Sequence, residues 1–191
     1  MTPKTSLFID WNGTIQWQIA GIITYVKANY TDRKGQSIEL SPLSFDRWNP
    51  PLGRKLGISE AEFNQVAWGN EWVFRNSPPY PGAKEAIQRL SEGYQIIIAT
   101  STNRPDLVEP WFEENGIYFD DILWTQDKCK IKGLLIDDAP ETIERRWCKQ
   151  LMTVRRELLW NCHLTNVPAL KDWRHLLTAN NPSQAIAFQS G

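Results

Sequence analysis

Acidic side chains directly follow two short apolar segments of the sequence. Asp10 comes after residues 7–9, and the pair Asp137 and Asp138 comes at the end of the apolar run 133–136. Short apolar runs of this kind are typical of strands that are buried on both faces. Clustered carboxylates repel one another unless a cation lies between them, and Mg²⁺ prefers oxygen ligands. The pattern therefore predicts a magnesium site that joins Asp10 to Asp137 or Asp138.

Hydroxyl groups and a lysine follow two further strand candidates. Thr100, Ser101 and Thr102 come after the apolar run 94–99, and Lys128 comes after the next strand candidate. Hydroxyl and backbone N–H groups are suitable donors for phosphate oxygens, and an ammonium group compensates charge on both phosphate and carboxylate. A carboxylate nucleophile, a metal and donors around phosphorus are the parts that phosphoryl transfer needs. Each part alone is common, but the ordered set is a strong signal.

Strands and helices alternate along the chain in a way that would bring these groups together. The order predicts an α/β fold with a doubly wound, Rossmann-like parallel sheet. In such a sheet the carboxyl ends of the strands share one edge, where open α/β folds bind their ligands. Strands are expected at residues 7–9, 94–99, 121–125, 133–136 and 157–160, and helices at 83–92, about 109–115, 140–147 and 172–177.

The segment between the first two strands is too long for a simple connection. A crossover needs about a dozen residues, whereas residues 15–80 separate these strands. We therefore expect a small helical cap at 15–80, inserted into a core domain of 1–14 and 81–180, with a flexible tail at 181–191. The clearest cap helix begins at Ser59, which has the capping-box spacing to Glu62.

Composition excludes several classes of protein. The chain has 191 residues, of which 41% are hydrophobic and 23% charged, as in an ordinary globular domain. A net charge of −1 argues against a nucleic-acid polymer or a membrane surface as partner. No apolar run approaches the ~20 residues of a membrane span. Three cysteines without a CxxC pair, and no signal-peptide pattern, favour a cytoplasmic protein. The sequence leaves the oligomeric state undecided, a homodimer included.

The groups at the strand ends resemble the motifs of the haloacid dehalogenase superfamily. Residues 10–14 stand where that family has its DxDGT motif, and residues 96–101 where it has a strand ending in Thr or Ser. Lys128 stands at the motif lysine, and residues 134–138 at the acidic fourth motif. The resemblance is closest to the 5'(3')-deoxyribonucleotidases. It extends through residues 80–83, 124–128, 158–161 and 172–174, which leaves out most of the cap.

This resemblance implies a Mg²⁺-dependent phosphomonoesterase that acts on a small phosphate ester such as a nucleoside monophosphate. Asp10 would be the nucleophile and would become a phosphoaspartate. Thr100 or Ser101, with Thr102 beside them, and Lys128 would bind the phosphoryl group that is transferred.

The resemblance also implies a metal site and a base pocket. Mg²⁺ would be held by the Asp10 carboxylate, the backbone carbonyl of residue 12 and an acid of the fourth motif, with Asp138 a better match than Asp137. Trp68 stands where the family has an aromatic residue that lines the base pocket, and base stacking on an aromatic ring is worth ~1–3 kcal/mol. The other cap aromatics are expected to form the core of the cap.

Asn12 departs from the family pattern, which has an acid at this position. That acid protonates the leaving alkoxide and later activates water, whereas an amide cannot donate and recover a proton at neutral pH. Loss of a general acid/base typically costs ~10²–10⁴-fold in rate. Three explanations stay open: a slow phosphatase or one with another acid, a silent relative that binds a nucleotide or phosphate ligand, and a substitution made to trap a complex. A dehalogenase also tolerates a non-acid there, but the Asp137-Asp138 pair disfavours it.

Two arginine pairs and a cysteine near the motifs are expected to have no role in the chemistry. Arg145-Arg146 and Arg155-Arg156 are expected to be surface charge, and Cys129 to be a small packing residue.

Overall fold

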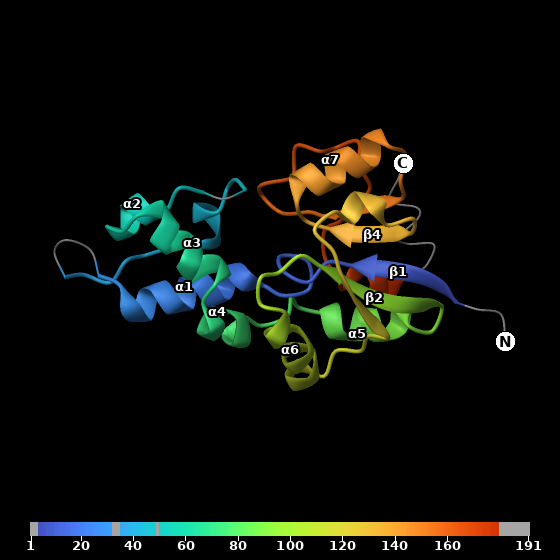
Figure 1. The fold of residues 1–191 in the computed structure, drawn as a ribbon, viewed down its shortest axis with the longest axis horizontal. Helices are drawn as coiled ribbons and strands as arrows, with labels where there is room; N and C mark the ends of the chain where they lie inside the picture. Colours follow the sequence, from blue (N-terminus) through green and yellow to red (C-terminus); the bar gives the residue numbers. More distant parts are fainter. Residues whose placement is uncertain (1–3, 32–34, 49, 180–191) are drawn as a thin grey trace.

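A six-stranded parallel sheet forms the centre of the protein (Figure 1). The computed structural model describes residues 4–31, 35–48 and 50–179. The strand order is β3-β2-β1-β4-β5-β6, and every pairing is parallel. The expected doubly wound α/β fold is confirmed, and its direction of winding reverses between β1 and β4, where such sheets form their crevice. The strands are β1 (Thr5–Ile9), β2 (Tyr94–Thr100), β3 (Asp121–Trp124), β4 (Leu134–Asp137), β5 (Thr153–Arg156) and β6 (Ala169–Leu170).

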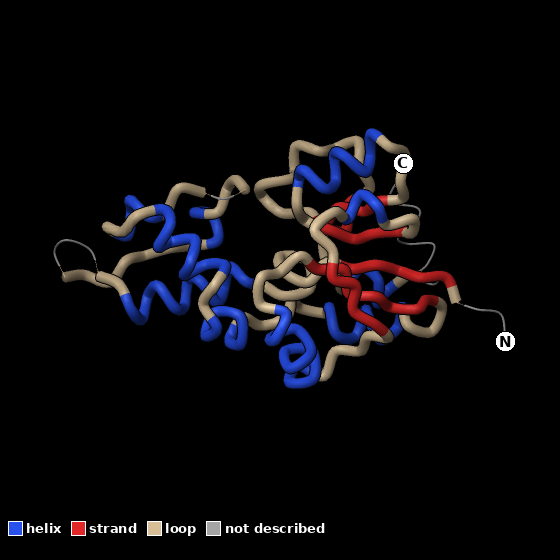
Figure 2. Tube along the Cα trace, in the orientation of Figure 1, coloured by secondary structure: helices blue, strands red, loops and turns tan. Residues whose placement is uncertain are grey.

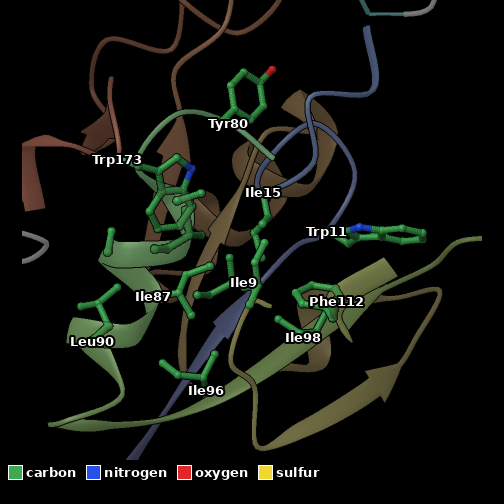
Figure 3. Close-up of a cluster of buried hydrophobic side chains, with 14 of the residues drawn as sticks. Ile9, Trp11, Ile15, Tyr80, Ile87, Leu90, Ile96, Ile98, Phe112 and Trp173 are labelled. Carbon is green, nitrogen blue, oxygen red and sulfur yellow. The ribbon is translucent and has the colours of Figure 1, made fainter. Parts of the chain in front are cut away.

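Helices cover both faces of the sheet. Helices α5 (Ala83–Leu90), α6 (Val108–Asn115) and α8 (His175–Thr178) contribute to one large apolar cluster, and α7 (Pro140–Cys148) packs in a separate one. Alternation along β1 explains this division, because Leu7 and Ile9 belong to the large cluster whereas Phe8 packs with residues of the other face. Figure 3 shows Ile9 of β1 in the large cluster, with Ile96 and Ile98 of β2 and side chains from α5 around it.

The described residues of the segment 15–80, which precedes α5, form four α-helices that lie to one side of the sheet (Figure 2). They have an apolar cluster of their own, to which Ile22, Val26, Phe63 and Val73 belong. The carboxyl ends of β1 and β4 point toward these helices (Figure 1). The division into core and cap stays a prediction, and the tail at 181–191 lies outside the described residues. The helices are α1 (Gln18–Asn29), α2 (Gly53–Leu56), α3 (Glu60–Trp68) and α4 (Glu71–Asn76).

The capping box before α3 is confirmed, and the helix ends at Trp68. Ser59 accepts a hydrogen bond from the N–H of Glu62, whose carboxylate accepts one from the Ser59 N–H. Asn70 then begins α4, because its side chain accepts from two N–H groups of the next turn. Phe74 therefore lies on a different helix from Phe63 and joins the large sheet cluster, where it stacks on Trp11 at 5.5 Å between ring centroids.

The expected fifth strand at 157–160 is wrong. The strand is β5, Thr153–Arg156, whose residues pair with Leu135, Ile136 and Asp137 of β4. Residues 158–161 form a turn instead, in which Asn161 Oδ1 accepts from the Leu158 N–H and Asn161 N–H donates to the Leu158 carbonyl. The short strand β6 was not expected. The pattern misled because β5 is half arginine, which is unusual for a buried strand.

The arginine pairs are also different from expectation. Arg145 is exposed, but Arg146, Arg155 and Arg156 are buried. Each of the three donates to backbone carbonyl oxygens, which offsets part of the cost of burial, although the buried Nε of Arg156 has no acceptor among the described residues. Cys129 is buried, as expected. None of the described helices combines the length and apolarity that crossing a membrane requires.

Candidate active site

The turn after β1 brings two carboxylates together. The Asp10 N–H donates to the carbonyl oxygen of Ile136 (2.9 Å), which keeps β1 and β4 paired to their carboxyl ends. Gly13 has a left-handed backbone, with φ of 79°. A Cβ atom on Gly13 would lie 2.2 Å from Oδ2 of Asp138, so a side chain there would collide with that carboxylate. Glycine in the motif therefore permits the approach of Asp138 to the end of β1.

A buried group of four charged residues, here named the acidic cluster, consists of Asp10, Lys128, Asp137 and Asp138. The Lys128 ammonium lies 2.5 Å from Oδ1 of Asp10 and 2.9 Å from Oδ2 of Asp137. One oxygen of each carboxylate lies within 4.8 Å of the others. All four residues are buried. Three carboxylates against one ammonium group leave an excess of negative charge, which favours binding of a cation.

Burial and the repulsion of neighbouring carboxylates raise the pKa of Asp10 and of Asp138. Burial raises the pKa of Asp10 to about 6, although the Lys128 charge acts to lower it; the charge of Asp137 adds to the increase. Burial, and next the charge of Asp10, raise the pKa of Asp138 well above its usual range. Burial acts to lower the pKa of Lys128, but attraction to Asp10 and Asp137 outweighs it and raises that pKa. A divalent cation between the carboxylates would reverse the shifts of the two acids.

The neighbours Asp137 and Asp138 have different partners. Asp137 accepts from Lys128 through Oδ2 and from the Ala139 N–H through Oδ1 (2.8 Å). Asp138 accepts from Thr14 Oγ1 (3.1 Å) and lines the pocket described below, as does Asp10. This donor set fits Mg²⁺, which takes few protein oxygens and keeps several waters. Asp10 and Asp138 are thus the carboxylates that line the pocket, and Asp137 holds the lysine.

The loop after β2 lies beside these carboxylates. The buried Thr100 accepts a hydrogen bond at Oγ1 from the Thr102 N–H (3.2 Å), and Thr102 Oγ1 accepts from the Arg104 N–H (3.2 Å). Ser101 is exposed, and its carbonyl accepts from the Gln126 side chain (3.3 Å). Residues 100–102 all line the same pocket as Asp10. The loop is thus fixed by its own hydrogen bonds, with Ser101 its most accessible hydroxyl.

Asn12 is held by a short relay of amide groups. Its Nδ2 donates to Oε1 of Gln16 (2.8 Å), and Nε2 of Gln16 donates to the carbonyl oxygen of Phe74 (2.8 Å). Gln16 is completely buried, so the Phe74 carbonyl fixes which end of its amide faces Asn12. A hydrogen-bond donor at position 12 therefore matches the acceptor that Gln16 presents.

One pocket of about 320 Å³ is lined by all of the predicted site residues except Asp137. Three indole rings line it and are here named the tryptophan cluster: Trp48, Trp68 and Trp160. Trp48 lies 6.3 Å from Trp68 and 6.0 Å from Trp160, between ring centroids. Trp160 follows β5 and donates through Nε1 to the Asp138 carbonyl (3.1 Å), so it connects the two clusters. Among the polar residues that line the pocket are Asp10, Asn12, Thr100, Ser101, Thr102, Lys128 and Asp138.

Solved structures with the same architecture are hydrolases. A Bacillus subtilis protein described as a hydrolase of the haloacid dehalogenase superfamily, solved with magnesium, matches with a TM-score of 0.61 and 14% identity over 92% of this chain and 97% of that one. A Lactobacillus delbrueckii protein described as a phosphoglycolate phosphatase gives 0.60 and 12%, over 92% and 97%. An L-2-haloacid dehalogenase gives 0.57 and 13%, over 92% and 100%. The chain has the haloacid dehalogenase fold.

The likeness to this superfamily is structural. No family model matches the sequence, and the search of curated proteins finds no significant relative. The three structures differ in the reactions that their names give, a phosphatase and a dehalogenase among them. The haloacid dehalogenase fold thus gives the place of the site, and the chemistry has to be argued from the residues.

Four segments that the sequence matched to motifs of the haloacid dehalogenase superfamily meet at this site. They are the turn at 10–14, the loop at 100–102, Lys128 and the pair at 137–138, and Trp68 from α3 lines the same pocket. Sequence reasoning missed Gln16 and Trp160. Gln16 gave no signal, because a lone glutamine after a glycine turn has no distinctive pattern. Trp160 was hidden by the incorrect strand at 157–160.

Proposed function

We propose that this protein is a Mg²⁺-dependent phosphomonoesterase that forms a phosphoaspartate on Asp10. The observation that carries the proposal is the acidic cluster: a buried aspartate at the end of β1, 2.5 Å from a buried lysine, beside two further carboxylates. A dehalogenase reaction on a neutral carbon has no need of so many acids around its nucleophile. A phosphate ester with a bound cation balances them.

Asp10 would act first as a nucleophile. A carboxylate oxygen attacks phosphorus, the bond between phosphorus and the ester oxygen breaks, and the leaving oxygen departs as an anion or takes a proton from water. Water then attacks the phosphoaspartate, which releases inorganic phosphate and restores Asp10. Lys128 holds Asp10 in its ionised form and lies near enough to accompany negative charge as it moves to the phosphoryl oxygens. The hydroxyl groups of Ser101 and Thr102, which line the pocket, are donors for those oxygens.

The metal would be held by the carboxylates of Asp10 and Asp138, together with the backbone carbonyl of Asn12. Mg²⁺ supplies charge neutralisation between the carboxylates and the phosphate. Asp137 acts through Lys128, since both of its oxygens already accept hydrogen bonds. Thr14 orients Asp138 by donating to its Oδ1.

Asn12 determines how the leaving group departs. An amide gives no proton, so the leaving oxygen has to be protonated by water or leave as a stable anion. Aryl phosphates have leaving groups that need little protonation. The ratio of their rate to the rate of alkyl esters should therefore be higher for this protein than for a phosphatase with an acid at position 12.

The substrate class that fits the tryptophan cluster is a nucleoside monophosphate or another small ester with a flat aromatic group. Indole rings from two parts of the chain, Trp68 of α3 and Trp160 after β5, line the pocket that also holds Asp10. Stacking of a base on such rings is worth ~1–3 kcal/mol. The proposed activity is therefore nucleotidase-like, with Trp68 in contact with the base.

The relay from Asn12 to Phe74 supports a second candidate, a silent relative that binds a nucleotide or phosphate ligand. An amide at position 12 is built into the buried hydrogen bonds of Gln16, as expected if binding rather than proton transfer is retained.

The experiment is a phosphate-release assay with Mg²⁺ on a panel of nucleoside monophosphates and aryl phosphates. Asp10→Asn is the matched control, because it preserves the shape of the side chain and removes the nucleophile. Release by the wild type that exceeds the control by at least about 10³-fold supports the enzyme. Equal release by both, together with Mg²⁺-dependent binding of the same ligands by calorimetry, establishes the silent binder instead.

A further inference from the structure

The guanidinium group of Arg146 is completely buried beneath the segment that carries Lys128. It extends from α7 toward the loops around η3 (Lys128–Lys130), a single turn of 3₁₀ helix. All five of its N–H groups are used. Nη1 donates to the carbonyls of Lys128 (2.8 Å) and Ile131 (2.9 Å), Nη2 to those of Gly133 (2.8 Å) and Met152 (2.9 Å), and Nε to Thr153 Oγ1 (3.0 Å).

This arginine has an unusual environment for a buried charge. Among the described residues, no carboxylate forms an ion pair with it, so its partners are neutral oxygens. Burying a cation without a counter-ion costs free energy, and burial does lower the pKa of Arg146. Hydrogen bonds to four carbonyls offset part of that cost. A buried guanidinium without a counter-ion is a poor way to stabilise the fold, but its five hydrogen bonds fix the segments around it. We therefore take its role to be the placement of those segments.

We infer that Arg146 is the positioning residue of Lys128. A 3₁₀ turn of three residues provides little rigidity by itself. Arg146 connects the carbonyl of Lys128 to the start of β5 through one planar group, whose donors have fixed directions. The inference rests on the proposed function in one respect, that Lys128 serves the phosphoryl group.

Placement of Lys128 is demanding because it serves two carboxylates at once. Its ammonium lies 2.5 Å from Asp10 and 2.9 Å from Asp137. A displacement of about 1 Å at such a position can cost about 10²-fold in rate. Lysine at position 146 would keep the charge but could not reach four carbonyls in one plane.

The kinetic test is a double-mutant cycle between Arg146→Lys and Lys128→Gln, with kcat/KM for an aryl phosphate as the readout. We expect Arg146→Lys to lower kcat/KM about 100-fold in the wild type and less than about 3-fold in the Lys128→Gln background. Equal losses in both backgrounds would overturn the inference, because Arg146 would then act independently of Lys128.

Arg89 provides a matched control at the far end of the core. Its guanidinium also donates to three backbone carbonyls, those of Leu176, Leu177 and Ala179, and none of these residues lines the pocket. Arg89→Lys should lower the melting temperature and leave kcat/KM within about 2-fold of the wild type. If Arg89→Lys and Arg146→Lys reduce kcat/KM equally at equal loss of stability, Arg146 is merely structural.

A measurement without turnover separates this inference from the proposed function. Amine labelling of Lys128, followed by mass spectrometry, reports how firmly the lysine is held, while hydrogen exchange in β2 reports global unfolding. Arg146→Lys should raise the labelling rate at least about 10-fold with β2 exchange unchanged. Thr153→Val, which has the same shape and leaves Nε without its acceptor, should give a smaller rise if Arg146→Lys does not fold. Labelling at the wild-type rate in the variant that folds contradicts the inference, whereas absent phosphate release by the wild type contradicts the function alone.

Discussion

The acidic cluster and the tryptophan cluster line one pocket but are held in different ways. Asp10, Lys128 and Asp138 are buried, and hydrogen bonds of definite direction hold their side chains: Lys128 donates to Asp10, and Thr14 donates to Asp138. Trp48 is 37% exposed, and its contacts to the other two indoles are ring contacts at 6.0 and 6.3 Å. Charge and hydrogen bonding fix the first group, whereas apolar contact fixes the second.

This difference indicates how the two groups divide the work. Hydrogen-bonded charges tolerate little displacement, so changes in the acidic cluster should affect every substrate alike. Ring contacts can adjust, so changes in the tryptophan cluster should alter which leaving groups bind. The predictions that follow test this division, and the largest expected effect comes first.

Asn12→Asp should raise kcat for a nucleoside monophosphate by ~10²–10⁴-fold, because it restores a proton donor for the leaving group. Aryl phosphates should gain much less. Steady-state rates for both substrate types measure the contrast. An equal gain for both would show that position 12 acts on something other than the leaving group.

The relay at position 12 sharpens this prediction. In the Asn12→Asp variant an ionised carboxylate would place a second acceptor against Oε1 of Gln16. A protonated carboxyl group would instead donate to Oε1, as the Asn12 amide does. The gain from Asn12→Asp should therefore be greater when the carboxyl group is protonated, toward lower pH. A gain that is independent of pH would indicate that Gln16 turns its amide and breaks its bond to Phe74.

Asp137→Asn and Asp138→Asn should have opposite effects on stability without metal. Asp137→Asn removes a partner of buried Lys128 and should cost about 3–5 kcal/mol in the free energy of unfolding. Asp138→Asn removes a repelled charge and should stabilise the metal-free protein. Chemical denaturation measures both changes.

The same pair should separate metal binding from lysine binding. Mg²⁺ should raise the melting temperature of the wild type, and Asp138→Asn should abolish that increase. Asp137→Asn should keep a Mg²⁺-dependent increase, although from a lower starting temperature. If Asp137→Asn alone abolishes the effect of Mg²⁺, the assignment of these two neighbours is reversed.

The metal-free protein should become less stable as pH rises from about 4 through about 6. Asp10 has a folded-state pKa of about 6 against 3.8 for the free side chain, so the folded state binds more protons in this range and loses stability as they dissociate. The loss from Asp10 is on the order of 2–3 kcal/mol. Unfolding in chelator at several pH values measures it, and Asp10→Asn should flatten the curve. A stability that increases across this range in the wild type would contradict the sign.

The sequence was most informative where chemistry and regular structure coincide. Asp10, Lys128 and the 137–138 pair each follow a strand or a strand's loop, so parallel topology alone predicts that they converge. The capping box at Ser59 was predictable for a similar reason, because its hydrogen bonds are local. These features depend on spacing and side-chain type, both of which the sequence displays.

Features that depend on distant partners were not predictable. The strand β5 contains Arg155 and Arg156, which look like surface residues until the carbonyls of later segments are placed around them. Arg146 is similar, because its acceptors come from segments that only the folded sheet brings together. Gln16 and Trp160 entered the site for the same reason. Trp68 was placed in the pocket only through the family resemblance, since indole spacing by itself does not distinguish a pocket from a core.

Trp68→Ala is the mildest test of the division between the two clusters. Loss of one stacking surface should weaken the binding of a nucleoside monophosphate by about 1–3 kcal/mol. This appears as a higher KM, and kcat should stay nearly unchanged. Trp72→Ala is the matched control, because Trp72 contacts Tyr25 at 5.6 Å between ring centroids and does not line the pocket.

Ligands without an aromatic ring show whether Trp68 acts on the leaving group or on the whole pocket. Inorganic phosphate as an inhibitor and a small alkyl phosphate as substrate reach the acidic cluster without a group to stack, so Trp68→Ala should affect neither by more than about 2-fold. If their binding weakens as much as that of the nucleotide, Trp68 supports the whole pocket instead of the leaving group. The two clusters would then form one cooperative unit, and the division that their contacts suggest would not extend to function.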